Sequence, residues 1–476
     1  MTTNIKRRRF LHGLAGVGAG LLLPTDRVLG ANERVNVAVA GVNGKGKGHV
    51  TAFNDIDNVN VIAICDPDTE VMAKSAKQAP RAQQIQDFRK ALEIKDLDAL
   101  VIATPNHWHA PMAIAACQAG KHVYVEKPVS HGIWEGRQMC AAQKKYNRVI
   151  QAGTQQLSCP APQECGEDIR SGKYGKVKWV HCFKIHDRPS AGKRTEPMTL
   201  PSHIDYNLWA GPAPMAPIYR DNLHYDWHWD LRWGDGEMGN WAVHYTSDLC
   251  FMLGWEEMPD SVMSAGGRFL WDDAADAPNM LFSMMEHQGI PLTVEIRDLT
   301  VSKNSKSRAT YMGLRGGNII MCEKGLIKIG RGGGKAYTPD GKQMLKQYVG
   351  NSGLGHRENF IDAIRANDHG KLNAPIEGCH VSSAICHLSN ISYLLGKQAA
   401  PDLIRARMKD YHDIRNTADE QLKQIKAHDA DMGKLVLGPK LTFDPKAERF
   451  VGRDSSEANA LLRYEMRKEF AVPDRV

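Results

Sequence analysis

Long hydrophobic runs are missing from most of this 476-residue chain. Beyond the N-terminus no stretch approaches about 18 consecutive apolar residues, so the sequence contains no candidate transmembrane helix and predicts no stable membrane insertion. Runs of Lys or Arg are also missing there, which argues against nucleic acid as a partner. We find no internal repeats. With 42% hydrophobic and 24% charged residues, the composition is ordinary for a globular chain of about two or three domains.

The ten cysteines include no C-x-x-C pair, so the usual patterns of a zinc ribbon or a redox dithiol are absent. Cys65 and Cys117 lie in apolar contexts and are expected to be buried thiols. Cys159 and Cys165 lie in a less apolar segment. They are the best candidates for a disulfide in an oxidising compartment.

The N-terminus has the features of an export signal. Residues 7–11 read RRRFL and fit the twin-arginine pattern R-R-x-F-L, a glycine-rich apolar stretch follows, and residues 28–30 fit a cleavage site. We therefore expect residues 1–30 to be a twin-arginine signal peptide and the mature protein to be periplasmic. The alternative is a basic tail before an amphipathic helix. Residues 1–30 carry five basic residues and one acidic residue, so their removal lowers the formal charge from +7 to +3.

Residues 35–48 have the pattern of a strand followed by a glycine-rich turn and a helix. In a nucleotide-binding βαβ unit such a turn lets the backbone approach a pyrophosphate at the helix N-terminus. The match to G-x-G-x-x-G is imperfect because Asn43 takes the middle position, although Asn tolerates positive φ better than most residues. The candidate pyrophosphate-binding residues are Gly41, Asn43, Gly44, Lys45 and Gly46.

A second buried strand, residues 59–65, ends at Asp66. A carboxylate there can accept hydrogen bonds from the adenosine ribose, and it would repel a 2′-phosphate. No arginine directly follows. The pattern therefore favours NAD over NADP, and the alternative is that Asp66 is only a turn residue before Pro67.

Two further strands, residues 98–103 and 121–125, alternate with helical segments, which predicts a parallel α/β sheet. The first strand ends at Thr104-Pro105-Asn106 and the second at Glu126-Lys127-Pro128. Ligands of parallel sheets sit at the carboxyl ends of the strands, so we expect both motifs to converge on one cleft. Charges at the end of a buried strand are costly unless they have a use. Proline also biases Lys127 toward an extended conformation.

The combination of these motifs resembles the Gfo/Idh/MocA oxidoreductases. The resemblance is carried by the glycine-rich turn, Asp66, ATPNHWH at residues 103–109 and GKHVYVEKP at residues 120–128, and it continues through much of the second half. It implies an N-terminal Rossmann domain and a C-terminal α+β domain with a large, mostly antiparallel sheet. We expect a signal peptide at 1–30, the Rossmann domain at 31–153, the α+β substrate and oligomerisation domain at 154–400, and a helical segment with an extended tail at 401–476.

The resemblance also assigns expected roles to residues. It places Lys127 beside the nicotinamide, hydrogen-bonded to the reacting hydroxyl, and makes His244 the general acid/base. Asn240 stands where the family usually has Asp, so substrate hydrogen bonding is expected there without proton chemistry. His109 matches a recurring histidine, whereas a surface role for His107 is as well supported as a functional one. The expected cofactor-binding residues beyond the turn and Asp66 are Thr104, Pro105, Asn106, His109, Glu126, Lys127 and Gln155.

Residues 224–244 contain four tryptophans and three histidines. Such a cluster suits a sugar subsite because aromatic faces pack on C–H groups, while the alternative is a tryptophan-rich core segment or interface loop. His224 and His228 have the spacing of helical metal ligands, but we expect no metal. We interpret GRGGG at residues 330–334 as a β-turn region, because no Lys-Ser/Thr follows. The candidate substrate-binding residues are His186, Arg188, Tyr225, Trp227, His228 and Trp241.

Three functional hypotheses follow. The first is an NAD-dependent oxidoreductase that acts on a sugar or glycoside hydroxyl, with Lys127 and His244 in proton transfer. The second is a glycoside hydrolase or epimerase that keeps its NAD and shows no net redox change, which the periplasmic location favours. The third is a non-catalytic sugar-binding protein. The family's open sheet face also implies a homo-oligomer, a dimer or tetramer.

Overall fold

The computed structural model describes residues 34–407, 415–474 and 476. The predicted signal peptide at residues 1–30 lies outside the described residues. The described residues from 35 onward form one compact unit. Across the described residues, none of the helices combines the length and apolar character that crossing a membrane would require.

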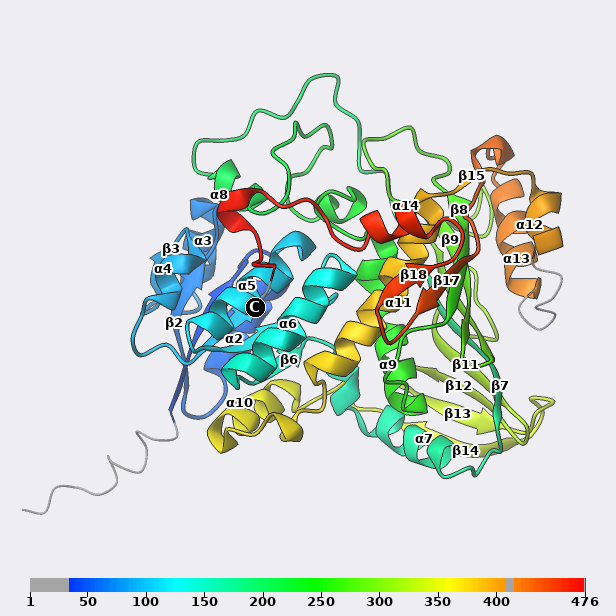
Figure 1. Cartoon of the computed structure of the whole chain (residues 1–476), viewed down its shortest axis with the longest axis horizontal. Helices are drawn as coiled ribbons and strands as arrows, with labels where there is room; N and C mark the ends of the chain where they lie inside the picture. Colours follow the sequence, from blue (N-terminus) through cyan, green and yellow to red (C-terminus); the bar gives the residue numbers. More distant parts are fainter. Residues whose placement is uncertain (1–33, 408–414, 475) are drawn as a thin grey trace, which may run out of the picture. The chain divides into compact units, whose positions relative to one another are not determined.

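The first sheet has six parallel strands in the order β3-β2-β1-β4-β5-β6. In Figure 1 its strands β2 and β3 lie at the left, in blue. Its strands are β1 (Val35–Ala40), β2 (Val59–Cys65), β3 (Gln83–Ile85), β4 (Ala99–Ile102), β5 (His122–Val125) and β6 (Ile150–Ala152). The connecting helices are α2 (Lys45–Asn54), α3 (Thr69–Ala76), α4 (Phe88–Leu92), α5 (His109–Gln118) and α6 (Ile133–Tyr146). A doubly wound sheet buries both faces, which explains why β4 is apolar throughout and β1 carries a single polar residue, Asn36.

Alternate side chains of these strands enter two cores. One core lies under α5 and α6 and contains Leu100 and Ile102. The other lies under α2 and α3 and contains Val101 and Tyr124. A distant helix, α10 (His356–Ala366), completes the second core with Phe360 and Ile361, so the Rossmann sheet takes part of its cover from a segment more than 200 residues later in the chain.

The second sheet has twelve strands and is antiparallel except where β7 pairs with β10. Its strands are β7 (Val177–Ile185), β8 (Ser261–Gly267), β9 (Met280–His287), β10 (Ile290–Arg297), β11 (Gly316–Cys322), β12 (Leu326–Gly330), β13 (Gly333–Tyr337), β14 (Met344–Val349), β15 (Lys397–Gln398), β16 (Val436–Leu437), β17 (Leu441–Asp444) and β18 (Arg449–Val451). The α/β fold with a Rossmann sheet and a mostly antiparallel second sheet is therefore confirmed.

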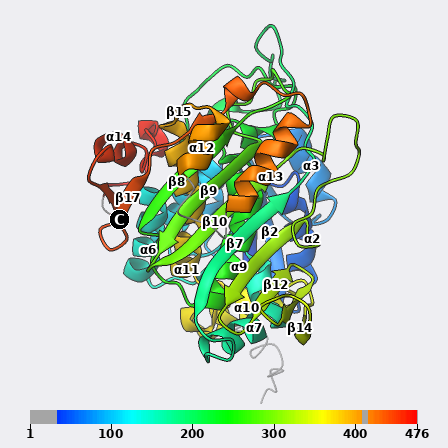
Figure 2. The same cartoon turned by 90° about the vertical axis from the view of Figure 1, so that its right-hand side faces the viewer.

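Helices pack on both faces of this sheet. The inner face carries α7 (Pro160–Arg170), α9 (Val243–Leu253) and α11 (Ile376–Leu394). The outer face over β8 and β9 carries α12 (Pro401–Arg407) and α13 (Arg415–Lys426), which lie in front of these strands in Figure 2. Two short helices, α8 (Tyr206–Ala210) and α14 (Ser455–Ala460), lie outside these layers. Part of the sheet face that the resemblance assigns to oligomer contacts is thus covered by the chain itself, and the homo-oligomer stays a prediction.

The C-terminal segment is more ordered than an extended tail. Residues 436–451 supply β16, β17 and β18, and β17 pairs with β8. The alternation of buried Leu441 and Phe443 with exposed Thr442 explains this strand, because its apolar side chains enter the core of the second domain. After α14 the described residues contain one short 3₁₀ turn, Lys468–Phe470, and no other regular element.

All ten cysteines are free and buried. Burial of Cys65 and Cys117 is confirmed, whereas the expected bridge between Cys159 and Cys165 is wrong. Cys159 caps the N-terminus of α7 and Cys165 lies inside that helix. Six helical steps separate their Cα atoms by roughly 9 Å, which exceeds the reach of a disulfide.

Candidate active site

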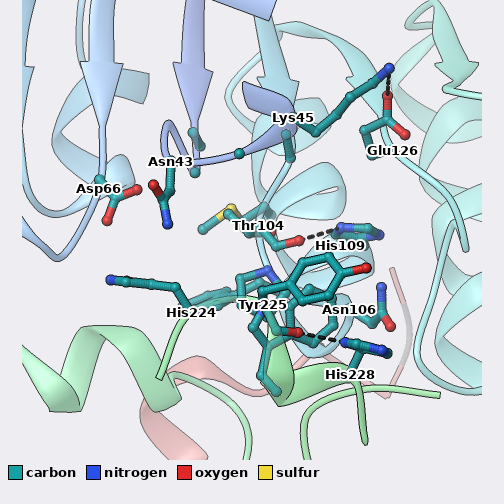
Figure 3. Close-up of a pocket in the computed structure, with 18 of the residues that line it drawn as sticks. Asn43, Lys45, Asp66, Thr104, Asn106, His109, Glu126, His224, Tyr225 and His228 are labelled. Carbon is teal, nitrogen blue, oxygen red and sulfur yellow. Dashed lines mark hydrogen bonds and ion pairs between the residues drawn. The ribbon is translucent and has the colours of Figure 1, made fainter. Parts of the chain in front are cut away.

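A cavity of about 490 Å³ lies where β1, β2, β4 and β5 end and where the second domain begins to cover them. Figure 3 shows side chains from both domains around it, with Asp66 and Asn43 on one side and Tyr225 and His228 opposite. The motifs after β4 and β5 both line this cavity, so the structure brings them together as the parallel sheet predicts.

The glycine-rich turn packs too tightly for side chains at two positions. Gly41 has φ +78°, and a Cβ there would lie 2.7 Å from the Ala103 carbonyl oxygen. A Cβ on Gly46 would lie 1.7 Å from the Gly41 carbonyl oxygen, whereas Gly44 faces open space. Asn43 lines the cavity and is not among the residues with positive φ, so the middle position does not need that conformation.

The N-terminus of α2 is suited to an anion. Gly44, its N-cap, offers no side-chain hydrogen bond to the first turn, and Gly44 and Lys45 both line the cavity. The free N–H groups of a helix N-terminus and a nearby lysine favour a pyrophosphate. The residues present therefore fit a dinucleotide. Gly46 lies behind the turn and does not itself line the cavity.

Asp66 is held rigidly at the end of β2. Its Oδ2 accepts the Val42 N–H at 2.9 Å and its Oδ1 accepts the Asp68 N–H at 3.0 Å. Burial raises the pKa of Asp66. Each carboxylate oxygen can accept more than one hydrogen bond, and Asp66 lines the cavity. Its proposed contact with the adenosine ribose stays a prediction.

Glu126 is buried at the end of β5 within a chain of polar groups. Arg357 donates Nε–H to His49 Nδ1 at 3.1 Å, so His49 must donate its Nε2–H to Glu126 Oε1 at 2.9 Å. Gln155 donates to the same oxygen at 3.1 Å. Although burial opposes ionisation, Lys45 and His49 hold the pKa of Glu126 well below its usual range. Glu126 is therefore a carboxylate beside the dinucleotide turn.

Lys127 points at the second domain rather than at Glu126. Its Nζ donates to the Asn240 carbonyl oxygen at 2.6 Å and to Asn240 Oδ1 at 3.1 Å. Burial lowers the pKa of Lys127 to about 8. The peptide between Lys127 and Pro128 is cis. The lysine is thus fixed at the wall of the cavity and sheds its proton more easily than a surface lysine.

Asn240 lies in a π-helical turn, Met238–Ala242, at the start of α9. Such turns often occur at functional sites. Its Nδ2 donates to Glu237 Oε1 at 2.9 Å, and Arg188 Nε lies 3.2 Å from the same oxygen. Burial alone would raise the pKa of Glu237, but His228 and Arg188 hold it below its usual range.

His244, one turn further along, also lines the cavity. Its Nδ1 is buried and has no hydrogen-bond partner among the described residues. Burial lowers the pKa of His244 far below its usual value, and Arg331 and Lys127 add to this effect. The ring is therefore neutral, and a polar group in the cavity is free to pair with it.

The expected substrate residues divide into two groups. Tyr225, Trp227, His228 and Trp241 line the cavity. His186 and Arg188 do not line it, but the His186 ring lies 5.1 Å from that of Trp241, and Arg188 donates to the Tyr225 hydroxyl at 2.8 Å. The other two tryptophans of residues 224–244 belong to the core, which was the alternative to a sugar subsite. Trp229 and Trp233 are buried in small apolar clusters.

The histidines mostly connect segments. His109 lies within hydrogen-bond distance of the Pro128 and Thr104 carbonyl oxygens and so links the ends of β4 and β5. His107 contacts the carbonyls of Trp209 and Trp233 instead and does not line the cavity. His224 pairs with Asp68 at 2.9 Å, whereas His228 contacts Tyr225. Within the part of the chain that the structure describes, no group of three His, Cys, Asp or Glu residues is arranged to hold a metal.

Several residues of the site were not predicted. The predicted turn at residues 330–334 is confirmed as the tip of the β12–β13 hairpin. The prediction did not include that Arg331, at this tip, lines the cavity. His49 and Arg357 orient Glu126, and Glu237 orients Asn240. Glycines around Arg331 signal a turn. No local pattern shows that this turn reaches the cavity.

Comparison with known proteins agrees with this geometry. Residues 35–154 match the oxidoreductase family with an NAD-binding Rossmann fold, and residues 177–276 match the C-terminal alpha/beta domain of the same Gfo/Idh/MocA group. The chain belongs to the Gfo/Idh/MocA oxidoreductase family, and its first domain is of the NAD-binding type.

Curated relatives share part of the chain. A glycosyl hydrolase family 109 protein of Shewanella pealeana is 37% identical over 107 residues, 21% of this chain and 24% of the relative. An alpha-N-acetylgalactosaminidase of Shewanella oneidensis is 30% identical over 158 residues, 27% of this chain and 34% of the relative. The matches thus span about a quarter to a third of the length of these relatives.

Solved structures share the fold over a larger part of the chain. Levoglucosan dehydrogenase in complex with NADH has a TM-score of 0.57 at 18% identity and covers 75% of this chain and 96% of its own. The WlbA dehydrogenase of Bordetella pertussis in complex with NADH and UDP-GlcNAcA has a TM-score of 0.56 at 19% identity, with coverage of 75% and 95%. At these identities the likeness concerns the fold alone.

Proposed function

We propose that this protein is an NAD-dependent enzyme that acts on a hydroxyl group of a sugar or glycoside, with Lys127 and His244 in proton transfer. One observation carries the proposal. Two groups able to hold a proton, Lys127 Nζ and the unpaired His244 Nδ1, line the same cavity as the dinucleotide turn. The lowered pKa of Lys127, about 8, makes it a base near neutral pH, whereas the strongly lowered pKa of His244 keeps its ring neutral, so that Nδ1 can accept a hydrogen bond.

The first domain would hold the cofactor. The N-terminus of α2 with Lys45 would take the pyrophosphate, Asp66 the adenosine ribose, and the region of Glu126 and Gln155 the nicotinamide side. Bound NAD supplies a hydride acceptor and donor. Tyr225, Trp227 and Trp241 of the second domain line the other side of the cavity.

The chain's own residues then handle the proton. Neutral Lys127 accepts the proton of the sugar hydroxyl, and its two hydrogen bonds to Asn240 keep its Nζ at the cavity wall. Neutral His244 accepts a hydrogen bond or proton at Nδ1. Trp241 and Trp227 offer apolar faces to the sugar ring.

The test begins with purified protein. Denaturation should release NAD, or added NAD should bind, and sugar-dependent NADH formation should fall at least 100-fold in Lys127→Met. The exposed Lys74→Met variant, with the same loss of charge on α3, should keep wild-type activity. Protein that neither contains nor binds NAD would rule the proposal out.

A second candidate is a glycoside hydrolase or epimerase that retains its NAD and shows no net redox change. The relatives named glycosyl hydrolase family 109 and alpha-N-acetylgalactosaminidase favour it. Aglycone release from aryl glycosides without added cofactor, lost in Lys127→Met, would support it. NADH that accumulates only with added NAD would support net oxidation instead.

We also propose that the mature protein is periplasmic. The twin-arginine pattern at residues 7–11 supports export. Cell fractionation should find the protein in the periplasm, and replacement of Arg7 and Arg8 by Lys should retain it in the cytoplasm.

A further inference from the structure

Arg331 has no partner at the place where the sugar would bind. It lies at the tip of the hairpin between β12 and β13 and lines the cavity together with Lys127 and His244. Its Nη1 is buried without a hydrogen-bond partner. Among the described residues, no carboxylate lies within ion-pair distance of its guanidinium. An unpaired buried guanidinium nitrogen is costly unless a ligand satisfies it.

Other cations near this end of the cavity also lack acidic partners. The Lys184 Nζ lies 4.3 Å from the centre of the Trp241 ring, which lines the cavity, and no described carboxylate pairs with it. Lys127 is bonded to Asn240 instead of an acid. Among the described cations of this region, Arg188 is paired with Glu237, and on the cofactor side Lys45 lies 3.8 Å from Glu126.

The acidic residues around this region do not offset the positive charge of Arg331 and Lys184. Glu237 is shared by Arg188, His228 and Asn240. Glu126 is bonded to His49 and Gln155 on the cofactor side. Asp248 and Asp298 are buried, which raises the pKa of Asp248 to about 8 and that of Asp298 well above its usual value, so both favour the neutral form.

We propose that the sugar substrate carries an anionic group, a carboxylate or a sulfate ester, and that Arg331 binds it. The inference rests on the proposed function, because it assumes a sugar in this cavity. A neutral sugar would leave the positive charge uncompensated. The planar guanidinium fork matches the oxygen spacing of both anions, which lysine does not.

The cofactor's own phosphates are the other anions that Arg331 could meet. The structure argues against these phosphates, because the N-terminus of α2 and Lys45 already supply a site for them. Arg331 comes from the second domain instead and lies close enough to His244 to lower its pKa. The NAD content of variants tests this point directly.

The experiment uses the full purified chain with NAD bound and compares pairs of sugars that differ at C6 alone, where one member carries an anionic group. The pairs are glucose with glucuronate, galactose with galacturonate, and glucose with glucose 6-sulfate, titrated by calorimetry and by tryptophan fluorescence. Wild-type protein should bind one anionic member at least about tenfold more tightly than its neutral partner. Arg331→Gln should lose that preference, and neutral sugars should bind it within about twofold of wild type.

Two further variants sharpen the result. Arg331→Lys keeps the charge without the fork and should recover only part of the preference. Arg449→Gln removes an exposed arginine of β18 that does not line the cavity, and it should behave as wild type. Thermal melting checks that each variant is folded.

Four outcomes would overturn the inference while leaving the NAD proposal intact. The first is equal binding of charged and neutral sugars by wild type, and the second is a preference that persists in Arg331→Gln. The third is loss of NAD from Arg331→Gln. The fourth is that none of these sugars binds and that sodium sulfate stabilises Arg331→Gln and Arg449→Gln equally. Failure of the proposed function has a separate signature, which is wild-type protein without bound or bindable NAD.

Discussion

Asn240 connects the lysine of the cavity to a buried acid. Its carbonyl and Oδ1 accept from Lys127, and its Nδ2 donates to Glu237 at 2.9 Å. An aspartate at this position would place a second carboxylate against Glu237 and could not donate to it. Glu237, three residues earlier, therefore explains why this chain has Asn at position 240 where the family usually has Asp.

Asn240→Asp should shift the pH dependence of the reaction. The new carboxylate would lie beside Lys127 and stabilise its ammonium form, so the pKa of Lys127 should rise from about 8 by roughly one unit or more. Since Lys127 must be neutral to accept a proton, the limb of kcat/KM that rises with pH should move to higher pH by the same amount. A pH–rate profile measures this. Asn367→Asp, at the exposed end of α10, should leave the profile unchanged; an unmoved profile in Asn240→Asp would remove Lys127 as the base.

Glu126→Gln should reduce stability most strongly at neutral pH. The folded pKa of Glu126 lies below its ordinary value, so its contribution is present above about pH 4.5 and is lost as the pH falls through the folded pKa. The variant should lose about 1.5–3 kcal/mol at pH 7, because His49 and Gln155 no longer donate to a charged oxygen. Urea unfolding at pH 7 and pH 4 should show the difference shrinking. The exposed Glu93→Gln variant should show no such trend.

At the scale of elements, α2 contains a matched pair of glycines. A Cβ on Gly46 would collide with the Gly41 carbonyl, whereas Gly48 has nothing within 4 Å. Gly46→Ala should separate α2 from β1 and abolish NAD binding, measured by calorimetry. Gly48→Ala should keep NAD binding and stabilise the protein by about 0.5–1 kcal/mol, because alanine favours the helix. Wild-type NAD affinity in Gly46→Ala would contradict the packing described for the turn.

Elements of the first domain could be predicted from the sequence because their signals are local. Apolar runs such as residues 59–65 mark buried strands, and glycines mark the turn at residue 41. Convergence of Thr104 and Glu126 follows from parallel strand geometry alone. The parallel pairing of β7 with β10 and the reach of Arg331 into the cavity could not be predicted, since both depend on contacts between segments far apart in sequence. The residues that orient Glu126 could not be predicted for the same reason, because Arg357 lies 308 positions after His49.

At the scale of the whole molecule, α12 and α13 cover the outer face of β8 and β9. Leu422 is 2% exposed and lies in one cluster with Phe282 and Met284, whereas Leu403 is 48% exposed. Leu422→Ala should therefore destabilise the protein by about 2–4 kcal/mol, and Leu403→Ala should change the free energy of unfolding by less than about 0.5 kcal/mol. Denaturant unfolding of both variants tests whether these helices are part of the core. Equal effects would mean that they are not.

The Rossmann sheet is covered in part by residues that follow it far along the chain. Phe360 of α10 packs against Phe53 and Tyr124, and the ring of Phe470 lies 5.3 Å from that of Trp108. While the ribosome is still translating the second domain, the first one lacks these covers and exposes apolar surface. The first domain can thus complete its apolar cover only once these later segments have been translated, so residues 35–154 expressed alone would leave this surface exposed.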